Sequence, residues 1–213
     1  SRRAKTMISK FSEFLSLLKH NQYSKLNGHS FTNTKMERNE LDLLYKYCTE
    51  EKIQSLGFHQ AIQKESFDYF ITSFLKPELF DTLYILNLSG NPKIEICKLL
   101  PKLRQISYLS LSDCQCEICD VLNYVSNMNR IKCIDLSHNK CSSTFNKTQS
   151  STLRFPPSFD TLIIDNVSFA SACIIPFFNF IFSRFEHGLK LSISSLITTG
   201  EVWSQFFDFL IFT

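Results

Sequence analysis

The sequence has little glycine, no long apolar run and no strong excess of charge of either sign. Five glycines in 213 residues provide neither a phosphate-binding glycine loop nor the Gly-x-Ser-x-Gly elbow of a serine hydrolase. A net charge of +3, with no basic stripe, argues against nucleic-acid binding. The most apolar stretch, residues 172–182, is far shorter than the roughly 20 residues that span a bilayer. We therefore expect no nucleic-acid partner and no membrane association.

Signals for catalysis are also missing. The chain has no His-Glu-x-x-His motif, and no Ser or Cys has a convincing histidine and acid partner in the sequence. We therefore predict that the chain is not an enzyme, with no catalytic residue, no cofactor and no small-molecule substrate.

The eight cysteines are too sparse for a disulfide-stabilised scaffold, so we expect reduced thiols and a cytoplasmic location. The segment Cys114-x-Cys116-x-x-Cys119 is dense enough in thiols to suggest zinc, with Cys133 or Cys141 as a fourth ligand. It lacks the paired Cys-x-x-Cys knuckles of structural zinc sites. We therefore favour structural thiols and predict no metal site.

A short apolar pattern recurs at offsets of 23 and 25 residues in the middle of the chain. Apolar side chains two residues apart on a short strand point to the same side, toward a core. A polar side chain three residues later can satisfy backbone groups of the turn that follows. The three copies are Leu83-x-x-Leu86-x-Leu88-x-x-Asn91, Ile106-x-x-Leu109-x-Leu111-x-x-Cys114 and Ile131-x-x-Ile134-x-Leu136-x-x-Asn139.

Weaker copies extend this pattern in both directions. They are Tyr23-x-x-Leu26-x-Gly28, Ile53-x-x-Leu56-x-Phe58, Phe159-x-x-Leu162-x-Ile164 and Leu189-x-Leu191, with Phe31, Ala61, Val167 and Ser194 in place of the asparagine. Helical spacing predicts helices between the strands, over residues 36–48, 64–75, 94–103, 117–128 and 173–185. We also predict an amphipathic helix over residues 1–19 that packs on the other units, with binding to a membrane surface as the alternative. Residues 142–158, which contain Pro156-Pro157, are predicted to form a loop.

The pattern resembles the leucine-rich repeat, in the ribonuclease-inhibitor-like subclass with its long strand-and-helix units. The resemblance implies an α/β solenoid, a horseshoe with a parallel β-sheet on the concave face and helices on the convex face. About seven repeats would form a single domain over residues 1–213. The chain begins with Ser1 and ends in the apolar run 206–212, so we expect it to be a piece of a longer protein.

The resemblance also implies a scaffold that binds a partner protein through the concave face. The repeat frame places six candidate partner-binding residues on outward positions of the strands: Asn87, Tyr108, Ser110, Cys133, Asp135 and Asp165. Tyr108 is the one large aromatic among them, the type of residue that anchors interfaces. The frame also puts His29 and His59 in one column, but Ser89 alone follows them there, so we do not predict a metal site from this pair.

Three functional settings stay open. The long, divergent repeats are similar to those of CARMIL-type proteins, which regulate the actin cytoskeleton, although the capping-protein-binding tail of that family is absent from this sequence. Similar solenoids activate the GTPase Ran, and Arg104 and Arg130 are the candidates for that role here. Others sense ligands within nucleotide-binding immune-type receptors. The sequence that flanks this domain would discriminate among the three.

Overall fold

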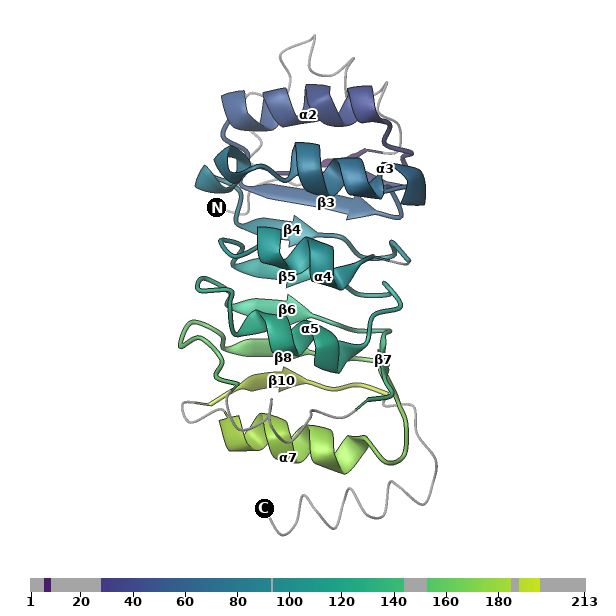
Figure 1. Cartoon of the computed structure of the whole chain (residues 1–213), viewed down its shortest axis with the longest axis vertical. Coiled ribbons are helices and arrows are strands. Elements are labelled where there is room, and N and C mark those ends of the chain that lie inside the picture. The colour runs from purple at the N-terminus through teal and green to yellow at the C-terminus, as the bar shows by residue number, and fades with distance from the viewer. Residues whose placement is uncertain (1–5, 9–27, 93, 144–152, 185–187, 196–213) are drawn as a thin grey trace.

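The computed structural model describes residues 6–8, 28–92, 94–143, 153–184 and 188–195. Its main element is a parallel sheet whose strands lie side by side in the same order as they occur along the chain (Figure 1). The strands of this sheet are β1 (Thr6–Ile8), β2 (Gly28–Thr32), β3 (Ser55–His59), β4 (Ile85–Asn87), β5 (Tyr108–Ser110), β6 (Cys133–Asp135), β8 (Thr161–Ile163) and β10 (Lys190–Ser192). Two short strands, β7 (Lys140–Cys141) and β9 (Ser168–Phe169), form a second parallel pair. The predicted α/β class with a parallel sheet is confirmed.

Helices occupy most of the connections between the strands and lie together in front of the sheet in Figure 1. They are α2 (Arg38–Glu50), α3 (Lys64–Tyr69) with the π-helical turn η1 (Phe70–Phe74) and the 3₁₀ turn η2 (Pro77–Asp81), α4 (Ile96–Leu99) with the 3₁₀ turn η3 (Leu100–Lys102), α5 (Ile118–Val125) and α7 (Ile174–Arg184). Each of the five predicted central and C-terminal helices is present at its expected place. The predicted loop has no helix or strand in its described part, residues 142–143 and 153–158.

Equivalent apolar side chains form a continuous row inside the protein. The strand pairing places them in register, each opposite the next: Leu56, Leu86, Leu109, Ile134 and Leu162. All five are buried, since the apolar sides of the helices pack against this face. The phenylalanines of the helical segments are mainly core residues: Phe67, Phe70, Phe74, Phe177 and Phe178 are buried, whereas Phe182 is exposed.

Buried asparagines hold the turns after the strands. Asn139 Oδ1 accepts the backbone N–H groups of Cys114 at 3.2 Å and Cys116 at 2.9 Å, and its Nδ2 donates to the Leu111 carbonyl at 2.8 Å. Asn91 does the same two strands earlier, after β4, where its Oδ1 accepts from the backbone N–H groups of Ala61 and Ile62. The predicted role of this position in satisfying backbone groups is therefore confirmed.

One residue after each of seven strands has a left-handed backbone. These residues, two positions after the last inward-facing side chain of each strand segment, are Asn33, Gln60, Gly90, Asp113, His138, Asn166 and Ser195, with φ between 50° and 71°. Six of them, all except Ser195, donate their backbone N–H to a carbonyl of the following strand segment, as in Asp113 to Ser137 at 2.9 Å. The repeated conformation lets the chain leave each strand in the same direction while its amide stays bonded.

The structure corrects the predicted register at both ends of the sheet. In β2, His29 rather than Leu26 is the partner of Leu56, so the predicted frame is displaced by three residues. In β10, Leu191 pairs with Leu162 rather than continuing the row of Ile164. A shift of two residues keeps the same side chains facing inward, so the apolar pattern of Leu189 and Leu191 did not exclude it.

The predicted N-terminal helix is wrong over Thr6–Ile8, which form strand β1 and pair with β2. The remainder of that predicted helix, and the copy at Tyr23 to Leu26, lie outside the described residues. Within the described part of the chain, every helix is too short or too polar to cross a bilayer.

Candidate functional site: the open strand face

The helices cover one face of the sheet, and the opposite face of β3 to β10 is called here the open strand face (Figure 1). Strand pairing arranges its side chains in two rows. The first row is Ser55, Ile85, Tyr108, Cys133, Thr161 and Lys190, and the second is Gly57, Asn87, Ser110, Asp135, Ile163 and Ser192. Five of the six predicted partner-binding residues lie in these rows, and Asp165 lies just beyond the second row at the end of β8. The structure therefore brings all six to one face.

Tyr108 is the most prominent of these residues. Its side chain is 42% exposed, whereas its row neighbours Ile85 and Cys133 are partly buried. Burial, and then the nearby carboxylates of Asp135 and Asp160, raise the pKa of the Cys133 thiol. The thiol beside Tyr108 is therefore neutral at physiological pH and contributes an apolar surface with a weak donor.

A polar depression of about 450 Å³ lies at the ends of strands β3 to β6, and Ser110, two residues after Tyr108 on β5, is part of its lining. It is lined by His59, Asn87, Ser89, Ser110, Ser112, Asp113, Asp135 and His138. Three of these, Asn87, Ser110 and Asp135, were predicted as partner-binding residues. Sequence reasoning missed Asp113 and His138, which also line the depression. Each immediately precedes the Cys or Asn of its turn and has a left-handed backbone, so this position in the repeat could have indicated them.

The carboxylates of the open strand face are held by neutral donors. Asp135 accepts hydrogen bonds from the hydroxyl of Ser110 at 3.1 Å and from the backbone N–H and hydroxyl of Ser137 at 3.0 and 2.7 Å. Asp165 accepts from the Ser194 backbone N–H at 2.7 Å. Among the described residues, no Lys or Arg nitrogen forms an ion pair with either carboxylate. Both are therefore fixed in orientation but keep an uncompensated negative charge.

A hydrogen bond of 3.0 Å joins His59 Nδ1 and the Ser89 hydroxyl at the rim of the depression. Within the described ranges, no carboxylate is bonded to the second ring nitrogen of His59, so the pair lacks the orienting acid of a catalytic triad. The pair fixes the rim, and the depression as a whole offers hydrogen-bond acceptors and donors rather than a proton-transfer chain.

The predicted column of His29 and His59 is wrong. His29 is fully buried in the interior row, with Nε2 3.1 Å from the Tyr47 hydroxyl, while His59 lies on the opposite face of the sheet. Burial lowers the pKa of His29 to about 4. The two imidazoles cannot share a metal.

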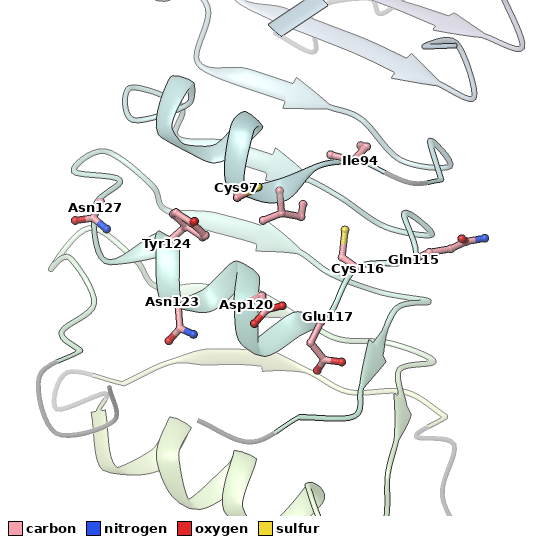
Figure 2. Close-up of a pocket in the computed structure, with 10 residues that line it drawn as sticks. Ile94, Cys97, Gln115, Cys116, Glu117, Asp120, Asn123, Tyr124 and Asn127 are labelled. Carbon is pink, nitrogen blue, oxygen red and sulfur yellow. The ribbon is translucent and has the colours of Figure 1, made fainter. Parts of the chain in front are cut away.

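A second concavity of about 570 Å³ lies on the helix side, and no residue pattern had indicated it. Figure 2 shows that its lining residues come from two segments, 94–97 around the start of α4 and 115–127 around α5. Burial, and then the neighbouring carboxylate of Glu117, raise the pKa of Asp120 there. Arg104 and Arg130, the candidates for a GTPase-activating role, lie elsewhere, exposed in the turns before β5 and β6.

Comparison with protein-family models gives no match, and no curated protein matches the chain either.

Proposed function

We propose that this chain is a leucine-rich repeat solenoid of the ribonuclease-inhibitor-like subclass that serves as a protein-binding scaffold through its open strand face. Four features support the repeat assignment: strands paired in chain order, an interior row of equivalent apolar residues, buried turn asparagines and a left-handed residue after seven of the strands. Stacked units of this kind contact mainly their neighbours and leave an extended strand surface for ligands.

The observation that carries the functional proposal is the position of Tyr108. It projects from the middle strands of the open strand face, on the strand that also contributes Ser110 to the polar depression, whose polar groups are already fixed by internal hydrogen bonds. A tyrosine has two torsions and a large contact area, so it loses little conformational entropy on binding and is common among interface residues that dominate affinity. Fixed neighbouring acceptors favour a partner with matching donors.

The charge of this face indicates the chemistry of the partner. Asp135 and Asp165 have no cationic partner in the described part of the chain, and Asp113 is exposed at the same rim. A protein surface that presents Lys or Arg beside an aromatic-binding hollow would be complementary to it, and such complementarity contributes most to association rate and specificity.

All eight cysteines are unpaired thiols, which supports a reducing compartment as the place of function. We propose a cytoplasmic location, and a single domain over residues 1–213, on this basis and on the continuity of the sheet from β1 to β10.

The test is affinity capture with the purified chain and quantification of each captured protein for wild type and variants. Tyr108→Ala should weaken capture of the specific partner by about tenfold or more, the loss typical of an interface anchor. Asp135→Lys should reduce it further by reversing the local charge. Circular dichroism and thermal melts establish that each variant is folded.

Two matched controls are available in the chain. The side chain of Tyr84 is 37% exposed, a fraction similar to the 42% of Tyr108, but Tyr84 lies outside both rows. Asp81 is exposed on the turn η2. Tyr84→Ala and Asp81→Lys should capture the partner as wild type does. Equal capture by wild type, Tyr108→Ala and Asp135→Lys would show that the middle of the open strand face is not the contact.

A further inference from the structure

Thiol and carboxylate groups meet at the edge of the protein where β7 and β9 pair. Cys119 lies in the first turn of α5, Glu117 precedes that helix, and Cys141 belongs to β7. The two sulfur atoms and a carboxylate oxygen all lie within 4.8 Å of one another, and the Sγ atoms of Cys119 and Cys141 are 3.7 Å apart. Both thiols are buried, while Glu117 is partly exposed.

Backbone pairing holds these groups together. Residue Lys140 forms a parallel bridge with Glu117, and its N–H donates to the Cys116 carbonyl at 3.2 Å. On the other side, the Cys141 carbonyl accepts the N–H of Ala170 at 2.9 Å. The Glu117 carboxylate accepts the backbone N–H of Ser142 at 3.0 Å and its hydroxyl at 2.6 Å. The donor set is therefore positioned by secondary structure and needs little rearrangement to bind a ligand.

The sulfur separation agrees with tetrahedral coordination. Two thiolates bound to Zn²⁺ at about 2.3 Å, at the tetrahedral angle, lie about 3.8 Å apart. The observed 3.7 Å is close to this edge length and well beyond the roughly 2 Å of a disulfide bond. Two sulfurs and one carboxylate oxygen are also donor types that zinc accepts in proteins.

We propose that Cys119, Cys141 and Glu117 bind a thiophilic divalent cation of the Zn²⁺ type, at a site separate from the open strand face. Cys173, buried just before α7, is the protein group available for the fourth position. Backbone hydrogen bonds link it to β7, since Ala170 donates its N–H to the Cys141 carbonyl and its own carbonyl accepts the N–H of Cys173 at 2.8 Å.

A bound divalent cation displaces the thiol protons of its ligands, because a coordinating thiol is deprotonated. The ion would tie α5 to β7, and through Cys173 to the start of α7, and so would link successive strand-and-helix units.

The site differs from the cysteine group that the sequence had suggested. Cys114 and Cys116 belong to the turn after β5, where the Cys114 thiol donates to the Leu88 carbonyl at 3.1 Å and the Cys116 thiol points to the Cys114 carbonyl. Cys133 lies on the open strand face. Only Cys119 and Cys141 of that group come together with Glu117.

The test uses the whole chain, reduced, stripped of metal with a chelator and then titrated with Zn²⁺ or Co²⁺. Wild type should bind one equivalent. Its Co²⁺ form should show the intense visible bands of tetrahedral cobalt and a near-ultraviolet thiolate-to-cobalt charge-transfer band. The melting temperature should rise with added Zn²⁺, since a ligand that binds the folded state stabilises it.

Variants locate the ligands. Cys119→Ser and Cys141→Ser should lose the charge-transfer band, whereas Cys48→Ser, which removes a buried thiol in α2, should keep it. Glu117→Gln retains hydrogen-bond acceptance from Ser142 and should fold, yet it should weaken binding by more than about tenfold, the smallest loss usual even for an outer-sphere partner.

Thiol titration shows beforehand that the cysteines are reduced. A reduced, folded wild type that binds no Co²⁺ with thiolate character would overturn the proposal. Unchanged affinity in Glu117→Gln together with an unchanged charge-transfer band in Cys119→Ser would overturn it as well. Neither result would bear on protein binding by the open strand face, because the two sites share no residue.

Discussion

His29 occupies the interior position opposite Leu56, and its Nε2 lies 3.1 Å from the hydroxyl of Tyr47 on α2. On the other side of Leu56 the row continues with Leu86, Leu109, Ile134 and Leu162, so His29 is a titratable group in line with aliphatic side chains. Burial disfavours its charged form, and its pKa falls from 6.5 to about 4. The interior therefore contains a group whose protonation opposes folding.

The first prediction concerns the pH dependence of stability. The folded pKa of His29 is below its unfolded value, so the unfolded state binds more protons between about pH 6.5 and pH 4 and stability falls as the pH falls through that window. Between pH 7.5 and pH 5 this effect alone should lower the free energy of unfolding by about 2 kcal/mol. Urea unfolding at both pH values measures it.

The matched variant is His29→Leu, which gives position 29 the same residue type as its partner on β3, Leu56. It should remove this part of the pH dependence and leave that of the carboxylates. If wild type and His29→Leu lose the same stability on acidification, His29 is not a buried neutral group.

The second prediction concerns the turn asparagines. Asn139→Ala removes side-chain bonds to Cys114, Cys116 and Leu111 and leaves their buried backbone groups without partners. Each such group costs about 1–3 kcal/mol, partly relieved by relaxation, so we expect a loss of about 3 kcal/mol in the free energy of unfolding. Asn139→Cys should lose less, because Cys114 occupies the equivalent position. Asn127→Ala, at an exposed site, should change stability by less than about 0.5 kcal/mol.

The third prediction concerns Gly90, which has φ of +71°. A Cβ at this position would come within 2.8 Å of Gln60 Cγ and 2.9 Å of His59 Cε1. Gly90→Ala should therefore destabilise the protein by about 1–2 kcal/mol through the left-handed backbone, and displace the His59 ring. Asp113→Gly, at the equivalent turn, should change stability by less than about 1 kcal/mol. Chemical denaturation gives the energies, and the His59 ring resonances in NMR spectra report the displacement.

The fourth prediction concerns Phe58, which is fully buried, with its ring centroid 5.3 Å from that of Phe70 and 5.6 Å from that of Phe74. Phe58→Ala leaves a cavity among these rings and should cost about 3–5 kcal/mol. Phe58→Leu, which retains most of the volume, should cost less than about 1.5 kcal/mol. Leu43→Ala on the exposed side of α2 is the control, and equal losses in all three would contradict this view of the core.

The middle of the fold was predictable because three signals coincide within each unit. Leu86, Leu109 and Ile134 are each followed two residues later by a leucine, which is the spacing of a strand. The segment after each strand has the apolar period of a helix. Asn91, Cys114 or Asn139 forms hydrogen bonds with backbone groups of the turn between them. Each signal limits the register that the others allow. The rows of the open strand face, and so the predicted partner-binding residues, follow from that register.

The ends were less predictable because one signal stood alone. At β2, the interior position is a histidine held by Tyr47, a contact between residues 18 positions apart that apolar periodicity does not report. At β10, the alternation of Leu189 and Leu191 fits two registers that differ by two residues, so the apolar pattern does not choose between them. Strand β1, Thr6–Ile8, lies inside a segment whose apolar spacing predicts a helix over residues 1–19.

The sequence by itself determined the class of fold, the order of the central strands and the side chains that face outward, because these depend on interactions within a unit or between neighbouring units. The tertiary structure alone decided which distant groups meet, as Cys119 does with Cys141 and His29 with Tyr47. Such meetings depend on how each connection brings its strand alongside the previous one, and that depends on the packing of whole units.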